Sequence, residues 1–311
     1  MKINCYYEFP SNDWNTSHYF EQIYKSLKTF CPQYTFNNID TRTLPERVAP
    51  CNGANKYSHA HMIIQNQKTF KYFLVTYWDK MSDIHEGNGW DMKNCVEIIT
   101  SSGTHSGDIL FKPLKVDFTP FSYLTSRIDV DKVINELSYI NNRDRVIPKT
   151  PMFKGLLYNF REYLKEDDRF DIKKTSEDIV LSHTEYMQHL NQFSINMSLN
   201  GAGQICYRDM EILGLGTALF RPKLSSNFYN PLIPDYHYIA VDYDHIKNVE
   251  PLEKYYNQLK ELMITRWSEV IKDRDFIDKV ALNGKKWFDE NVPKEKHWKI
   301  LSKILNFNKL K

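Results

Sequence analysis

The chain has 311 residues, in which 41 lysines and arginines stand against 39 acidic residues and leave a formal net charge of +2. A balance so near zero argues against a protein whose whole surface binds a polyanion such as nucleic acid. Hydrophobic residues make up 41%, enough for a substantial core, and no apolar run approaches the length of a membrane span. We therefore expect a cytoplasmic globular protein, long enough for two α/β domains.

The first half of the chain predicts strands and helices in alternation. Residues 3–9 predict a strand and residues 19–30 a helix, and residues 71–78 and 95–100 predict two further strands that end in polar loops. Residues 130–140 have helical spacing. This order of elements is typical of an α/β domain.

A polar segment with two prolines, residues 141–151, is typical of a linker between domains. We place a first domain at residues 1–148, a second at 149–290 and a C-terminal amphipathic helix at 291–311. The last stretch alternates apolar residues with lysines, so it either packs as a terminal element or lies on an anionic membrane.

Five cysteines lie at wide spacings without a Cys-x-x-Cys pair: Cys5, Cys31, Cys51, Cys95 and Cys206. An odd, scattered set predicts neither a disulfide framework nor a zinc site. We expect reduced thiols.

The most informative segment is residues 192–222. Residues 195–199 predict a short strand, residues 200–203 a glycine turn, residues 204–213 a helix and residues 217–220 a second strand. A glycine turn at the carboxyl end of a strand presents backbone N–H groups and a helix N-terminus to an anion. The segment therefore predicts an anion site on an α/β domain.

Two charged residues on that helix, Arg208 and Glu211, are three positions apart and share a face. An arginine fork suits a diphosphate and a carboxylate suits ribose hydroxyls, although the two side chains could also pair with each other. The spacing alone leaves both interpretations open.

The set of Gly201, Gly203, Arg208, Glu211 and Gly216 resembles the donor-binding unit of GT-B glycosyltransferases. At the level of scattered motifs, the segment is most similar to the CAP10-like and related cell-surface polysaccharide or viral glycosyltransferases. The neighbouring segments 152–161, 182–190, 234–241 and the region of Trp287 also resemble parts of that domain, so the resemblance covers roughly residues 150–305.

The resemblance implies two Rossmann-like domains that face each other across a cleft, the first binding the acceptor and the second the donor. The implied activity is metal-independent transfer of a sugar from a nucleoside diphosphate sugar, with no cofactor, to a glycan or lipid-linked acceptor. No nucleic acid is implied as a partner, and the C-terminal helix is a candidate for peripheral membrane contact. The implied donor-binding residues are Lys154, Asn200, Gly201, Gly203, Tyr207, Arg208 and Glu211.

Retaining members of the fold place a second glutamate about eight positions after the first. Leu219 and Phe220 stand there in this chain, so no stereochemical outcome follows from Glu211.

A general base is expected on a loop of the first domain. Asp79 directly follows the strand predicted at residues 71–78, beside Trp78, whose apolar face could raise the pKa of the carboxyl or stack on a sugar. Asp13, His85 and His105 are alternatives on equivalent loops, and Asp79 could also simply cap a helix.

Two other interpretations stay open. Asp242 and Asp244 resemble the Asp-x-Asp motif with which GT-A glycosyltransferases hold Mn²⁺ on a diphosphate. His59 and His61 could share a strand face for a metal, although a hydrogen-bonded core histidine is the commoner case. The protein could also be a sugar- or nucleotide-binding protein without turnover.

Overall fold

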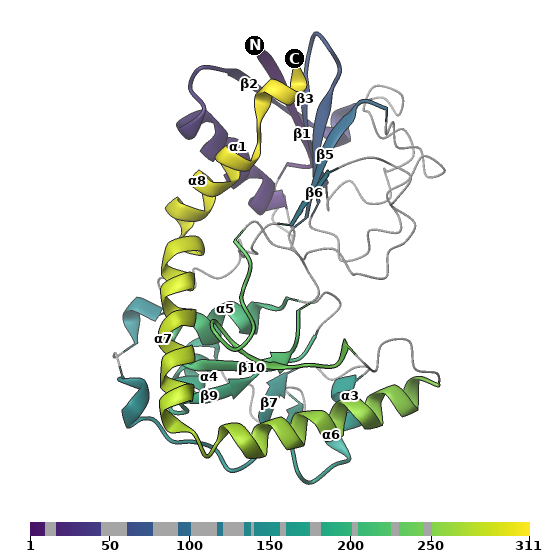
Figure 1. Ribbon diagram of the computed structural model, residues 1–311. Coiled ribbons are helices and arrows are strands. Elements are labelled where there is room, and N and C mark those ends of the chain that lie inside the picture. Colours follow the sequence, from purple (N-terminus) through teal and green to yellow (C-terminus); the bar gives the residue numbers. More distant parts are fainter. Residues whose placement is uncertain are drawn as a thin grey trace.

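The computed structural model describes residues 1–9, 17–44, 61–76, 93–100, 117–120, 134–137, 140–155, 160–174, 182–200, 205–224, 230–244 and 251–311. The fold is mixed α/β, as the sequence predicts, and it forms an upper and a lower lobe, called here the first and second lobes (Figure 1). No helix in these described ranges is both long and apolar enough to cross a lipid bilayer.

The first lobe holds a six-stranded sheet in the order β2-β1-β3-β4-β5-β6. Its strands are β1 (Lys2–Tyr7), β2 (Thr35–Asp40), β3 (His61–Asn66), β4 (Tyr72–Thr76), β5 (Cys95–Thr100) and β6 (Asp117–Pro120). β3 runs antiparallel to both β1 and β4, whereas the other pairings are parallel. β1, β2, β4, β5 and β6 therefore point the same way, with their carboxyl ends toward the second lobe (Figure 1).

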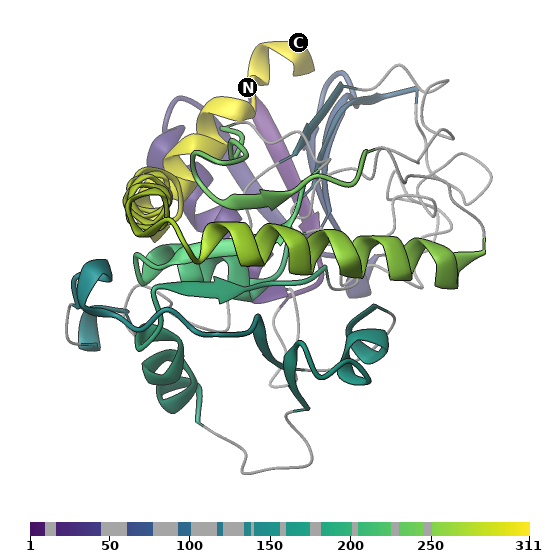
Figure 2. The same cartoon turned by 60° about the horizontal axis from the view of Figure 1, so that its bottom comes forward.

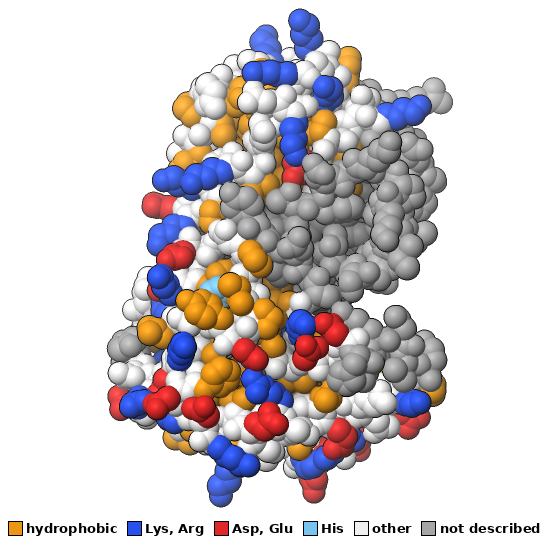
Figure 3. Space-filling model, in the orientation of Figure 1, with side chains coloured by type: hydrophobic (Ala, Val, Ile, Leu, Met, Phe, Trp, Pro, Cys, Tyr) orange, Lys and Arg blue, Asp and Glu red, His pale blue; other side chains and the backbone are white. Residues whose placement is uncertain are grey.

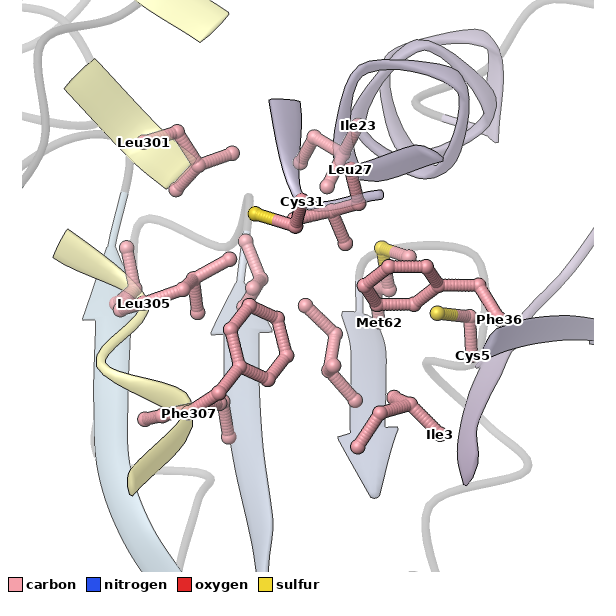
Figure 4. Close-up of a cluster of buried hydrophobic side chains, with 14 of the residues drawn as sticks. Ile3, Cys5, Ile23, Leu27, Cys31, Phe36, Met62, Leu301, Leu305 and Phe307 are labelled. Carbon is pink, nitrogen blue, oxygen red and sulfur yellow. The ribbon is translucent and has the colours of Figure 1, made fainter. Parts of the chain in front are cut away.

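One helix covers this sheet at the N-terminal end of the chain, α1 (Ser17–Phe30). Phe20, Ile23 and Leu27 lie three and four positions apart on one face and are fully buried. They pack against Ile3 and Cys5 of β1 (Figure 4). The predicted strand at 3–9 and helix at 19–30 are confirmed.

The C-terminal residues return to the first lobe and complete its core. α8 (Lys294–Ile304) and the 3₁₀ helix η8 (Phe307–Leu310) bring Leu301, Leu305 and Phe307 into the same cluster as β1 and α1 (Figure 4). Asn66 Nδ2 and Thr69 Oγ1 donate hydrogen bonds to the Leu310 carbonyl at 2.8 and 2.6 Å. The apolar side of the predicted C-terminal helix is thus packed in the protein, and membrane contact of its lysines stays a prediction.

The second lobe is built on three parallel strands in the order β11-β10-β9 and on a parallel pair, β7 with β8. Its strands are β7 (Met152–Gly155), β8 (Asp171–Lys174), β9 (Ile195–Met197), β10 (Ala218–Pro222) and β11 (Ile239–Val241). Its helices are α3 (Phe160–Lys165), α4 (His183–Asn191), α5 (Tyr207–Gly214), α6 (Leu252–Val270) and α7 (Arg274–Asn291). α6 lies along this sheet (Figure 2), where the Trp267 ring meets the Phe220 ring edge-on at 5.0 Å.

The predicted linker at 141–151 is fixed to the second lobe. Arg145 is buried and donates to the carbonyls of Asn191, Leu215 and Gly216 at 2.7–3.0 Å. Val146 pairs with Phe193 in a parallel bridge. The segment is thus anchored by hydrogen bonds that its own composition does not reveal.

The predicted helix at 204–213 begins later than expected, at Tyr207. Cys206 has extended backbone angles, and the Asp209 carboxylate accepts a hydrogen bond from its N–H at 2.6 Å. This hydrogen bond gives the Cys206 N–H, which has no partner within the helix, an acceptor, and it fixes the start of α5. Ile205 is buried ahead of the helix and not on its face.

Candidate functional site

Three arginines surround the N-terminus of α5 and the carboxyl ends of β9 and β10. They are Arg161 of α3, Arg208 of α5 and Arg221 of β10, and we call them the arginine cluster. Parallel strands place the residues that follow them at one edge of the sheet, which is where open α/β sheets bind ligands. Asn200 and Arg208 of the predicted anion site lie at this edge, whereas Gly201 and Gly203 are outside the described residues.

Arg208 is half-buried, with its position set by aromatic side chains. Its guanidinium lies over the Phe153 ring at 4.0 Å, and its Nε donates to the Tyr186 hydroxyl at 2.7 Å. Burial raises the pKa of the Tyr186 phenol to about 12, so the phenol stays protonated at neutral pH. The hydroxyl therefore orients the guanidinium without neutralising its charge.

Arg161 is buried beside the turn that follows β9. Its Nη2 donates to the Leu199 carbonyl at 2.8 Å and lies 3.3 Å from the Cys206 sulfur. Burial raises the pKa of the Cys206 thiol, which keeps the sulfur neutral. The positive charge of Arg161 is therefore held close to the first turn of α5.

Arg221 is buried and forms an ion pair with Asp209, with Nη1 and Oδ2 2.6 Å apart. Its Nη2 also donates to the Asn200 side chain at 2.7 Å. Asn200 is exposed, so this bond joins the end of β9 to a buried cation and leaves the rest of the amide at the surface. Asp209 is the carboxylate that the described structure pairs directly with the cluster.

Glu211 is buried, and its Oε1 lies 2.9 Å from Nε2 of His183, the first residue of α4. The Ser182 side chain caps that helix and fixes the histidine at its start. Glu211 accordingly contacts His183, and its negative charge also acts on the Arg208 guanidinium.

Among the described side chains, this edge brings three guanidiniums and a helix N-terminus together with two carboxylates. Asp209 forms an ion pair with Arg221, and Glu211 lies within electrostatic range of Arg208. A phosphate or diphosphate would accept hydrogen bonds from guanidinium and backbone N–H groups in this setting.

Several predicted site residues lie outside the described part of the chain: Gly201, Gly203, Asp13, Asp79, His85 and His105. Lys154 is in β7 and Tyr207 begins α5, but the structure describes only their backbone. β1 ends at Tyr7 and β4 at Thr76, so Asp13 and Asp79 follow strands whose carboxyl ends point toward the second lobe (Figure 1).

Arg221, Asp209 and His183 were not among the site residues predicted from the sequence. Arg221 lies in the otherwise apolar run Ala-Leu-Phe-Arg-Pro, and this pattern indicates a buried ion pair. A charged side chain in a buried strand needs a partner of opposite charge. Nothing in the spacing identified Asp209 or His183 as the partners.

The carboxylates of the alternative metal motif bind a lysine. Lys223 Nζ lies 3.1 Å from Asp242 and 2.8 Å from Asp244. Hydrogen bonding to Asp244 and Asp242 raises the pKa of Lys223. His61 is buried in β3, and His59 is outside the described residues. Within the described ranges, no cluster of three histidine, cysteine or acidic side chains has the geometry to hold a metal ion.

No protein-family model matches this chain, and no curated protein matches it.

Proposed function

We propose that this protein is a GT-B-like glycosyltransferase that moves a sugar from a nucleoside diphosphate sugar to a glycan or lipid-linked acceptor. The observation that supports it best is the arginine cluster at the N-terminus of α5. The proposal includes two Rossmann-like domains facing each other across a cleft, with the donor on the second lobe.

In the proposed reaction the bond between the sugar's anomeric carbon and the diphosphate breaks, and the acceptor oxygen bonds to that carbon. Negative charge grows on the departing diphosphate. Arg208 and the N–H groups at the start of α5 would stabilise that charge. They would take the place of the metal ion that stabilises the diphosphate in metal-dependent glycosyltransferases. No cofactor enters the reaction.

The acceptor hydroxyl must lose a proton as it attacks. Asp79 is the proposed general base, with Asp13 and His85 as alternatives on loops of the first lobe. The first lobe's parallel strands point toward the second lobe, so the loops that follow them start on the side where the donor would lie (Figure 1).

Glu211 keeps its proposed role toward the ribose hydroxyls through its second carboxylate oxygen. In the described structure that oxygen accepts no hydrogen bond, whereas Oε1 is held by His183. His183 would then be a positioning residue that orients the carboxylate.

Turnover of a panel of nucleoside diphosphate sugars, followed by release of the nucleoside diphosphate, tests the proposal. We expect turnover with at least one donor. Turnover should fall strongly in Asp79→Asn and should be unchanged by EDTA. Turnover that EDTA abolishes and Mn²⁺ restores would favour the alternative based on Asp242 and Asp244. Binding of a donor without any turnover would indicate the non-catalytic alternative.

A further inference from the structure

A hollow of about 620 Å³ lies where α7, α8 and the turn at residues 230–237 meet. Sites for small molecules usually measure roughly 300–1,000 Å³. Ile300 and Lys303 come from α8, which packs on the first lobe, whereas the turn and α7 belong to the second. Among the described residues, the hollow shares none with the arginine cluster.

The turn that forms one wall is held in place and displays apolar side chains. Asp235 has φ +55°, and its carboxylate accepts a hydrogen bond from Ala240 N at 3.0 Å. α7 approaches closely because Gly284 has no side chain; a Cβ there would lie 2.6 Å from the His237 carbonyl. Ile233 and Tyr236 nevertheless stay 48% and 47% exposed, on a face where hydrophobic side chains gather over α7 (Figure 3).

Two lysines from different helices line the same hollow. Lys286 of α7 and Lys303 of α8 are exposed, and neither forms an ion pair within the described ranges. Ammonium groups placed in this way suit a phosphate. Glu290 and Asn283 of α7 add a carboxylate and an amide, which are typical partners of hydroxyl groups.

His237 supplies a further hydrogen-bond donor. Its Nδ1 accepts from Ile233 N at 2.9 Å, and burial lowers the pKa of the ring, which is neutral near pH 7. The proton of the neutral ring therefore sits on Nε2. Because His237 lines the hollow, this N–H can serve a ligand's oxygen.

We propose that this hollow binds a small sugar phosphate. The phosphate lies between Lys286 and Lys303, and the hydroxyls meet Glu290 and Asn283. The apolar face of the sugar ring lies on Tyr236. Since the lysines belong to helices packed on different lobes, the ligand joins the two lobes, and it does so whatever reaction the protein performs.

Calorimetric titration of the full chain tests this, with four probes: glucose 6-phosphate, glucose 1-phosphate, mannose 6-phosphate and ribose 5-phosphate. We expect at least one to bind more tightly than glucose or inorganic phosphate alone. Loss of one charged contact in Lys303→Gln or Lys286→Gln should weaken binding about tenfold or more. Tyr236→Ala should also weaken it, whereas Lys299→Gln, an exposed lysine of α8 outside the hollow, should leave it unchanged.

Three results would overturn the proposal. The first is no binding of any of the four probes at millimolar concentration. The second is binding that Lys286→Gln and Lys303→Gln leave intact, or that inorganic phosphate reproduces in full. The third is binding that Arg208→Ala abolishes while both lysine variants retain it, which would place the probe at the arginine cluster.

Discussion

The ion pair between Arg221 and Asp209 is the most constrained contact of the candidate site. Its side chains are 1% and 0% exposed, so both charges are shielded from water and each stabilises the other. Asp209 also sets the start of α5, and Arg221 holds the Asn200 side chain. This pair shapes the edge at which the half-buried Arg208 is presented.

Replacing Asp209 with asparagine should therefore be costly, because it removes the carboxylate that is paired with the buried Arg221 guanidinium in the described structure. We expect a loss of about 3–5 kcal/mol in the free energy of unfolding, measured by urea denaturation. Asp242→Asn, which breaks an exposed pair with Lys223, should cost no more than about 1 kcal/mol. Equal effects of the two variants would contradict this account.

Tyr186 predicts a dependence of stability on alkaline pH. Phenols in the unfolded chain ionise near pH 10, whereas burial raises the pKa of Tyr186 in the folded protein to about 12. Unfolding therefore releases a proton at high pH, and stability falls as the pH rises from about 10 to about 12. Urea midpoints should fall less between pH 9 and pH 11 in Tyr186→Phe than in the wild type; an identical fall would argue against a buried phenol.

Residue patterns predicted Arg208 on a helix, with a diphosphate or Glu211 as its partner, but not the aromatic rings that contact it. The rings of Phe153 and Tyr186 that hold its guanidinium come from segments far apart in sequence. Local spacing governs which side chains share a helix face, and it says nothing of contacts made across the fold. For the same reason the contact of Glu211 with His183 was not predicted.

At the scale of elements, strongly apolar strands were predictable and weakly patterned ones were not. β4 and β5 lie within predicted strands because both consist mostly of apolar residues, and most of these are buried. Phe36 is the one buried residue of β2, and the sequence Thr-Phe-Asn-Asn-Ile-Asp lacks a continuous apolar pattern. The place of antiparallel β3 between β1 and β4 depends on pairing between strands, which periodicity does not encode.

The packing of α7 against the turn at residues 230–237 gives a prediction for Gly284. Alanine favours a helix by about 1 kcal/mol over glycine. Its Cβ would nonetheless meet the His237 carbonyl at 2.6 Å, a backbone atom that cannot move aside alone. We expect Gly284→Ala to be destabilised by about 1–3 kcal/mol in thermal or urea unfolding. Leu282→Ala, at an exposed position of the same helix, is the control, and stabilisation by Gly284→Ala would show that the two elements are not in contact.

At the scale of the whole molecule, the chain begins and ends in the same lobe. Phe307 lies against the rings of Tyr34, Phe36 and Phe73 at 4.7, 5.7 and 5.9 Å. The sequence predicted the amphipathic character of the last segment but not its binding surface, since many apolar faces could receive it. Residues from both ends of the chain thus form the hydrophobic core of the first lobe (Figure 4).

Phe307→Ala should destabilise the first lobe selectively. Removal of a buried aromatic side chain typically lowers the free energy of unfolding by about 3–5 kcal/mol. Hydrogen–deuterium exchange should show faster exchange in β1, β4 and α1, with little change in β10 and α6. Phe30→Ala, at a position 37% exposed on α1, should have a much smaller effect. Uniform loss of protection in both lobes would mean that they unfold as one unit.

If the arginine cluster holds the diphosphate of a sugar donor, the protein should bind at least one of UDP, GDP, ADP and CDP in calorimetric titration. Arg208→Ala should weaken that binding about tenfold or more, whereas replacing Arg143, an exposed arginine of the second lobe, with alanine should leave it unchanged. Binding that Arg208→Ala leaves intact, or no binding of any of the four, would contradict the claim.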